Sequence, residues 1–228
     1  MPTATLWFDV VSPWSFFALA VLKRYKQLWN LDVVLKPTFL GGVMVASGNQ
    51  PPLNVKNKGA WMNGMDLPLA SDFFRLPYTF PTKFPLSTIH VMRFLRAVEE
   101  KYGQGEKLDQ ATDAFFAAIW QATPSLPAVE AIKPENFAQI ASSFLSSKSE
   151  IEEIVKLSTS NDIKDKLKAE SAQVVENGAF GFPWILLERD DGQKRHFFGS
   201  DRFEQMAFWL GKEWKGPCPS EGRRESKL

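Results

Sequence analysis

"FDVVSPWSFFALAVLKRY" (residues 8–25) passes directly from a strand pattern into a helix pattern. The apolar and aromatic residues of Thr5–Val10 predict a buried strand. Ser12 offers an N-cap oxygen, and Pro13 suits the first position of the helix that follows. Ser12 and Ser15 also have the spacing of the two thiols in a CxxC redox motif. This joint is therefore a helix cap, a redox site that has lost its sulfur, or a site that handles the sulfur of a ligand.

The segments after the joint first complete a strand–helix–strand unit. Helical spacing of apolar residues continues to about Leu28, and Leu31–Leu40 predicts a second strand. Residues 41–85 are rich in Gly, Pro and Asn, and only a short helix near Leu69–Phe74 is expected there. Several amphipathic helices are expected from Ser87, a candidate cap, to Gly178, a candidate stop.

The C-terminal part returns to strand periodicity. Trp184–Glu188 and Lys194–Phe198 predict a hairpin that turns at Asp191-Gly192, and Asp201 is expected to cap a last helix. The order βαβ, many helices, ββα predicts an α/β protein with a thioredoxin-like fold and a large all-helical domain inserted. The predicted domains are residues 1–60 and 179–228 for the two thioredoxin-like halves, the second with the tail, and residues 61–178 for the insertion.

Composition and charge argue against several classes of function. The chain has 228 residues, of which 44% are hydrophobic and 23% charged, as in an ordinary soluble globular protein. A net charge of +1 with no basic stripe argues against nucleic-acid binding. No apolar run approaches the roughly 20 residues that span a bilayer, and the N-terminus runs directly into a strand. A membrane span and secretion are therefore not expected.

The chain has one cysteine, Cys218, in a Pro-flanked tail. A single cysteine excludes an internal disulfide and a CxxC redox centre. Because no nearby His or helix start would lower its pKa, Cys218 is expected to be an incidental surface thiol.

The last three residues, Ser226-Lys227-Leu228, match a receptor-read peroxisomal address. A Gly- and Pro-rich tail precedes them and should leave them exposed. We therefore expect a peroxisomal import receptor as a partner, and the peroxisome, with the cytoplasm as a second location.

Serine in place of cysteine removes redox exchange from the joint but keeps hydrogen bonding. A hydroxyl can donate to a thiolate that a ligand supplies. Lowering the pKa of a free thiol from about 8.5 by two takes about 2.7 kcal/mol. A hydrogen bond to a charged acceptor supplies about 1.5–3 kcal/mol, and a helix N-terminus adds about 0.3–1 kcal/mol. One serine is enough for this role, although on this segment alone helix capping is the favoured explanation of Ser12.

A second segment, "NGAFGFPWILLE" (residues 177–188), places Pro183 directly before a strand. Thioredoxin-like proteins carry a cis-proline here, facing the start of the first helix, and the preceding residue can then pair with an extended peptide. "FFGSDR" places Ser200 and Asp201 at the start of the last helix, where they would hold an amine or a carboxylate, or would only cap the helix.

Six segments of the sequence resemble the kappa-class glutathione transferases. They are "FDVVSPWSFFALAVLKRY", "GGVMVASGNQPP", "NKG", "GAFGFP", "FFGSDR" and "LGKEWKGPCPS". They occur in the family's order over the thioredoxin-like parts of the chain, and the helical middle matches more loosely. The resemblance implies a homodimeric enzyme that takes glutathione as co-substrate and conjugates it to, or uses it to reduce, a small electrophile.

The same resemblance assigns roles to single residues. Ser12 would be catalytic, by stabilising the glutathione thiolate. The implied glutathione contacts are Ser12, Pro13, Trp14, Asn49, Lys58, Phe182, Pro183, Ser200 and Asp201. Asp201 would hold the ammonium of the γ-glutamyl end and Ser200 its carboxylate, whereas Trp14 departs from the family's usual tyrosine. No metal is expected, because His90 and His196 lack spaced ligand partners.

Two other functions stay open. The chain also resembles 2-hydroxychromene-2-carboxylate isomerase, which shares the serine and the Phe-Gly-x-Pro element and uses glutathione. A peptide-binding module without catalysis, built on the same cleft, is the other alternative. It predicts binding of extended peptides without turnover.

Overall fold

The predicted strand–helix–strand unit opens the fold. In the computed structural model, which describes residues 1–220, β1 (Thr3–Phe8) leads into α1 (Pro13–Tyr25) and then β2 (Asp32–Pro37). β2 pairs parallel with β1, with Leu6 opposite Leu35. β1 ends two residues earlier than expected, because the chain turns at Asp9: the Ser12 N–H donates to the Asp9 carbonyl at 3.0 Å.

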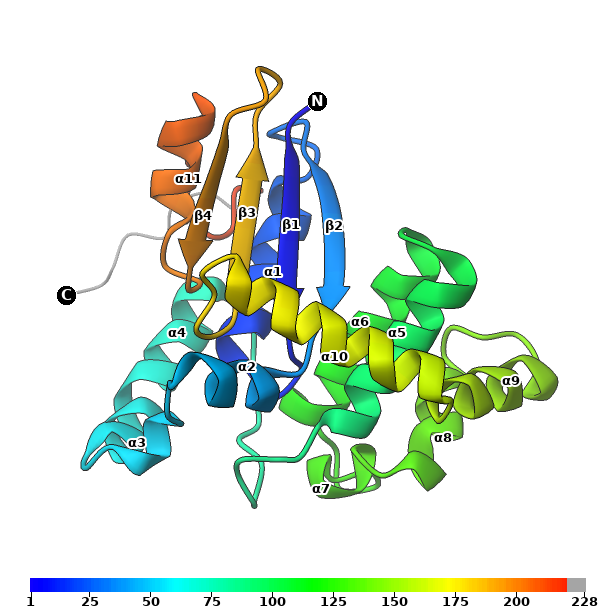
Figure 1. The fold of residues 1–228 in the computed structure, drawn as a ribbon. Coiled ribbons are helices and arrows are strands. Elements are labelled where there is room, and N and C mark those ends of the chain that lie inside the picture. Colours follow the sequence, from blue (N-terminus) through cyan, green and yellow to red (C-terminus); the bar gives the residue numbers. More distant parts are fainter. Residues whose placement is uncertain (221–228) are drawn as a thin grey trace.

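The hairpin at the C-terminal end completes the sheet. β3 (Trp184–Glu188) pairs antiparallel with β1 and with β4 (Lys194–Phe198), so the strand order is β2-β1-β3-β4. Buried residues of α1 and of α11 (Phe203–Leu210) share one hydrophobic cluster with Leu6 and Ile185. Trp7 and Trp184 belong to a second cluster on the opposite face, which α2 (Leu40–Ser47) and α10 (Asn161–Glu176) cover (Figure 1). The thioredoxin-like α/β fold is confirmed.

The helical middle is also confirmed. Its longer helices are α4 (Leu67–Phe74), α5 (Ile89–Tyr102), α6 (Glu106–Trp120), α9 (Lys148–Ser158) and α10, with shorter turns at α7 (Ala128–Ala131), η3 (Pro134–Asn136) and α8 (Phe137–Ala141). The N-cap of α5 is Thr88, not Ser87, and α10 ends just before Gly178 at φ +92°. None of the helices within residues 1–220 combines the length and hydropathy needed to cross a bilayer.

Residues 40–66 are more helical than the sequence predicts. They form α2, a 3₁₀ turn η1 (Pro52–Asn54), α3 (Lys58–Trp61) and a π-helical turn η2 (Met62–Asp66). Two glycines make α2 a poor helix by propensity, so its tertiary contacts stabilise it. Val43 is fully buried, and a Cβ on Gly41 would lie only 2.8 Å from the Phe39 ring. The division into domains at residues 60 and 178 stays a prediction; α2 packs on α10, and α5 packs on β2.

Residues 211–218, which follow α11, pack as a strap along α1. The Trp29 indole N–H donates to the Glu213 carbonyl at 3.0 Å, and the Trp214 ring stacks on Tyr25 at 4.9 Å. Cys218 is only 7% exposed, and Arg24 donates to its sulfur at 3.1 Å. The prediction of a surface thiol is therefore wrong, because the strap carries Cys218 inward. The Ser226-Lys227-Leu228 signal lies outside the described residues.

Candidate functional site

Ser12 lies at the end of the sheet where β1 meets α1, and it is the N-cap of that helix as predicted. Its Oγ accepts a hydrogen bond from the Ser15 N–H at 3.2 Å and donates to the Phe182 carbonyl at 3.1 Å. The side chain is 4% exposed. Ser12 thus caps its own helix and also joins it to a segment 170 residues away in the sequence.

The opposite wall of the site is the turn before β3. The Phe182–Pro183 peptide bond is cis, as predicted for this position. Within residues 1–220 the Phe182 N–H makes no hydrogen bond, and its carbonyl accepts only from Ser12. A backbone N–H that is free beside an available carbonyl can pair with an extended peptide.

The second serine of the motif does not join this site. Ser15 is fully buried, and its hydroxyl has no hydrogen-bond partner among the described residues. Pro13 is buried at the first turn of α1, and Trp14 is half-buried, with its ring 6.1 Å from that of Phe17. Of the first turn of α1, Ser12 therefore supplies the polar group and Trp14 the partly exposed aromatic surface.

Asn49 is held against the cis-proline turn from the end of α2. Its Nδ2 donates to the Phe180 carbonyl at 2.6 Å, and its Oδ1 accepts from the Gln50 N–H. Asn49 is exposed, so the carboxamide is accessible at the rim. The structure thereby brings Ser12, Asn49, Phe182 and Pro183 together at one end of the sheet.

Ser200 and Asp201 follow β4 and adjoin the same turn, because the Gly199 N–H donates to the Pro183 carbonyl at 3.1 Å. Ser200 is 5% exposed, whereas Asp201 is exposed and pairs with Arg202 at 2.7 Å. The prediction that Asp201 caps α11 is wrong: the N-cap is Arg202, and no side chain bonds the first turn. The Asp201 carboxylate therefore does not cap α11 and pairs with the exposed Arg202 instead.

Lys58 is the predicted site residue that the structure leaves apart from this group. It is the first residue of α3 and is exposed, and it has no ion pair with any described residue. Asp66, a residue that sequence reasoning missed, lies near Asp201. Burial, and then the Asp201 carboxylate, raise the pKa of Asp66. Two neighbouring carboxylates suit a cation such as an ammonium group.

Asp9 is the second residue that sequence reasoning missed. It is fully buried beneath Ser12 and accepts hydrogen bonds from Val11, Leu40 and Thr88. Burial raises its pKa from 3.8 to about 6, although the three hydrogen bonds act in the opposite direction. The sequence did hold one signal for Asp9: it is the only charged side chain before Lys23, in a stretch that is otherwise apolar or uncharged.

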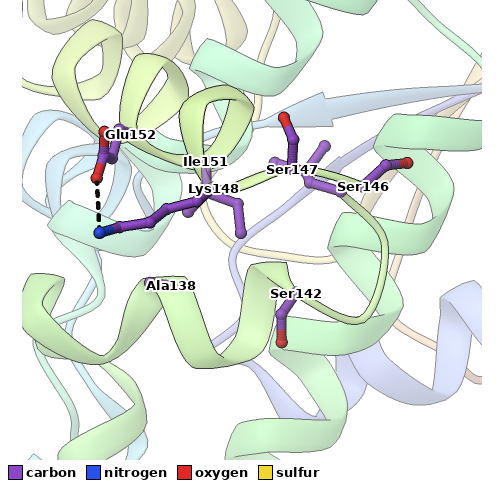
Figure 2. A pocket seen from close by; sticks show the side chains of 8 residues that line it. Ala138, Ser142, Ser146, Ser147, Lys148, Ile151 and Glu152 are labelled. Carbon is purple, nitrogen blue, oxygen red and sulfur yellow. Dashed lines mark ion pairs between the residues drawn. The ribbon is translucent and has the colours of Figure 1, made fainter.

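A pocket between α8 and α9 lies apart from this site. It occupies about 340 Å³, and its lining is mixed: Leu145 and Ile151 are apolar, whereas Ser142 and Lys148 are polar (Figure 2). Its charged residues, Lys148 and Glu152, pair at 3.6 Å and are largely exposed. No predicted site residue lines it. Among residues 1–220, no three His, Cys, Asp or Glu side chains are grouped as a metal site.

Comparison with known proteins gives relatives over nearly the whole chain. The family described as DSBA-like thioredoxin domain matches residues 3–210. Glutathione S-transferase kappa 1 of Rattus norvegicus is 32% identical over 219 residues, which cover 94% of this chain and 93% of that protein.

Solved structures share the fold. The 2-hydroxychromene-2-carboxylate isomerase structure has a TM-score of 0.73 at 19% identity and covers 92% of this chain and 94% of its own. The cytosolic disulfide reductase DsbM from Pseudomonas aeruginosa, solved with GSH, has a TM-score of 0.61 at 15% identity, covering 92% and 98%. At these identities the two structures bear on the fold alone.

Proposed function

Because this chain belongs to the DSBA-like thioredoxin family and, within it, to the kappa-class glutathione S-transferases, we propose that it holds glutathione as a thiolate at Ser12 and delivers it to a small electrophile. The observation that carries this proposal is the position of the Ser12 hydroxyl. It lies at the N-terminus of α1 and 3.1 Å from the carbonyl that precedes cis-Pro183. Sequence similarity to the kappa class supports transferase activity. The position of the Ser12 hydroxyl supports its role in stabilising the thiolate.

The proposed step needs only a rotation of the Ser12 hydroxyl. Its proton turns from the Phe182 carbonyl to the glutathione sulfur, while its oxygen still accepts from the Ser15 N–H. The thiol proton leaves to solvent, and the hydrogen bond and the α1 amides stabilise the thiolate. The sulfur then forms a bond to the electrophilic carbon, whose leaving group departs with the bonding electrons. No enzyme–substrate bond forms, so catalysis is thiolate activation plus proximity.

The rest of the tripeptide would be bound along the same end of the sheet. The free Phe182 N–H and the released carbonyl would pair with the cysteinyl backbone, with Asn49 at the rim and Pro13, Trp14 and Pro183 in contact. Asp201, assisted by Asp66, would attract the γ-glutamyl ammonium, and Ser200 would bind its carboxylate. Lys58 would pair with the carboxylate at the glycine end.

Binding and turnover together test this function. Calorimetry with glutathione should show a Kd of about 1 mM or lower, and glutathione should be conjugated to chlorodinitrobenzene. Isomerisation of a hydroxychromene carboxylate with no conjugation would favour the second candidate, an isomerase like the one whose structure has this fold. If the protein bound extended peptides but not glutathione, the remaining function would be that of a peptide-binding module without catalysis.

We also propose that the protein is a homodimer. Seven large apolar side chains on residues 45–73 are between 39% and 84% exposed, and we call them the α2–α4 surface: Val45, Leu53, Val55, Trp61, Met65, Leu69 and Phe73. Monomeric proteins seldom leave so many apolar side chains uncovered on adjacent elements. Asp66, which lies near Asp201, is the last residue of η2 on this surface, so a second copy docked here would adjoin the glutathione site.

Charge placed on this surface should separate the subunits. Sedimentation should show a dimer for the wild type and a monomer for Leu69→Glu, because a carboxylate at the centre of an apolar interface is costly to bury. Phe208→Glu is the matched control, since Phe208 is 88% exposed on α11 and is not one of the seven residues of this surface. A wild type that sediments as a monomer, or a Phe208→Glu variant that alone dissociates, would contradict the proposal.

The import signal gives a further proposal, that the protein is peroxisomal. It is supported by the terminal Ser226-Lys227-Leu228 alone, which lies outside the described residues. A fluorescent fusion at the N-terminus should be found in peroxisomes, and deletion of the three residues should leave it in the cytoplasm. Import that persists after the deletion would contradict the signal.

A further inference from the structure

Asp9 is a buried carboxylate to which the catalytic proposal gives no role. It follows β1 directly and is 0% exposed. Its Oδ1 accepts from the Val11 N–H at 3.0 Å and from the Thr88 hydroxyl at 2.6 Å, and its Oδ2 accepts from the Leu40 N–H at 2.9 Å. These donors belong to the Ser12 loop, to the start of α5 and to the start of α2, so one side chain joins three parts of the fold.

Two of these donors are used in an unusual way. Phe39, the N-cap of α2, has no side-chain oxygen, so Asp9 satisfies the first helical N–H from a distant position. Thr88 is the N-cap of α5, yet its hydroxyl makes no bond to its own helix and donates to Asp9 instead. Both helices therefore have their starts fixed to the same carboxylate.

From Asp9, one branch of contacts leads to the outer wall of the site. Asp9 holds the first residue of α2, and this helix ends at Gly48, directly before Asn49. Asn49 donates to the Phe180 carbonyl in the cis-proline turn. The position of this turn is thus linked to Asp9 through the length of α2.

The other branch leads to Ser12. Asp9 fixes the Val11 N–H with its side chain and the Ser12 N–H with its own carbonyl. Ser12 then donates to the Phe182 carbonyl, in the same turn that Asn49 holds. Both branches start at the buried Asp9 and end at the cis-proline turn, so the contacts enclose the site from two sides.

We propose that Asp9 is a positioning residue for the thiolate site: its carboxylate fixes the Ser12 loop and α2 relative to each other, and so sets the separation between the Ser12 hydroxyl and the cis-proline turn. This inference rests on the proposed function, since it acts through Ser12. Asp9 does not touch the substrate. If the fold alone required a residue here, a carboxylate would be unexpected, because burying a carboxylate without an ion-pair partner carries a large desolvation cost.

A double-mutant cycle tests the coupling to Ser12. Kinetics with glutathione and chlorodinitrobenzene are compared for the wild type, Asp9→Asn, Ser12→Ala and the double variant. Asp9→Asn should lower kcat about tenfold, the effect of one charge-assisted hydrogen bond, and should also raise the KM for glutathione because the Asn49 wall moves. In the Ser12→Ala background the same change should lower kcat by less than about twofold.

Thr88→Val keeps the carboxylate but removes its hydroxyl donor. It should change kcat/KM in the same direction by a few-fold, and Thr88→Ser should restore it. The pair therefore keeps the proposal testable if Asp9→Asn does not fold. Glu99→Gln is the matched control, because it removes another buried carboxylate, one that pairs with Lys36 and Arg96 and shares no hydrogen bond with Asp9 or Ser12 among the described residues.

Each outcome decides between explanations. If Asp9→Asn costs the same factor with and without Ser12, or if Glu99→Gln lowers kcat/KM equally, Asp9 serves the fold only and the inference is overturned. If Asp9→Asn keeps wild-type kinetics, it is overturned as well. If Ser12→Ala itself keeps wild-type kinetics, the proposed role of Ser12 is the one that fails.

Discussion

Ser12→Ala is expected to return the pKa of enzyme-bound glutathione from about 6.5 toward the free-thiol value of about 8.5. The variant keeps the α1 amides but loses the hydroxyl that lies 3.1 Å from the Phe182 carbonyl and can turn to the sulfur. At pH 6.5 the thiolate fraction would fall from about one half to about one hundredth, so conjugation should slow on the order of fifty-fold. Above about pH 8.5 the two enzymes should converge, because the thiol is then ionised in both.

The measurement is the pH dependence of kcat/KM, together with the thiolate absorbance of bound glutathione. Loss of the N-cap should cost about 1 kcal/mol of stability, so each variant is first shown to be folded by circular dichroism. Ser15→Ala is the matched control, because that hydroxyl is fully buried and has no hydrogen-bond partner among the described residues. A Ser12→Ala profile that overlays the wild type would remove Ser12 from the mechanism.

The stability of the protein should depend on pH through Asp9 in a direction opposite to that of most carboxylates. Burial raises its pKa from 3.8 to about 6, against the hydrogen bonds from Thr88, Val11 and Leu40. A carboxyl with a raised pKa stabilises the fold fully below the unfolded value and loses this contribution as the pH rises through the folded value. The wild type should therefore lose about 3 kcal/mol relative to Asp9→Asn from pH 3 to pH 7, mostly above about pH 4.

Urea unfolding of the two proteins at several pH values isolates this effect, since other carboxylates cancel in the difference. Thr88→Val provides an internal check. In the wild type the hydrogen bond from the Thr88 hydroxyl lowers the pKa of Asp9. Thr88→Val loses this bond, so the pKa rises further and the stability of the variant should change more with pH. A difference between wild type and Asp9→Asn that stays flat across this range would show that Asp9 titrates normally.

The parts of the site that the sequence predicts correctly are those set by neighbours in the chain. Ser12 caps α1 because a hydroxyl precedes a proline at a strand–helix joint, and Pro183 is cis at the start of β3 as the thioredoxin-like order predicts. Both depend on a few adjacent residues. The order of strands in the sheet follows in the same way from the βαβ and ββα halves.

The parts that the sequence does not predict depend on distant contacts. α2 forms in spite of its two glycines because Asp9 satisfies its first N–H and Trp7 packs in the same cluster as Val43. Cys218 is buried because Arg24 and the strap hold it, although its local sequence is typical of a loose tail. Asp9 itself joins three segments, so no local pattern shows its role.

The hydrogen bond between Ser12 and the Phe182 carbonyl makes the response of Ser12 depend on whether the glutathione sulfur is ionised. An amide carbonyl is a better acceptor than a neutral thiol, and a thiolate is a better acceptor than either. While the sulfur is protonated the hydroxyl therefore stays with Phe182, and it changes partner only when the sulfur ionises. One hydrogen bond is exchanged for a stronger one, so Ser12 contributes little to holding the neutral tripeptide. Its full contribution falls on the ionised form, the form that reacts.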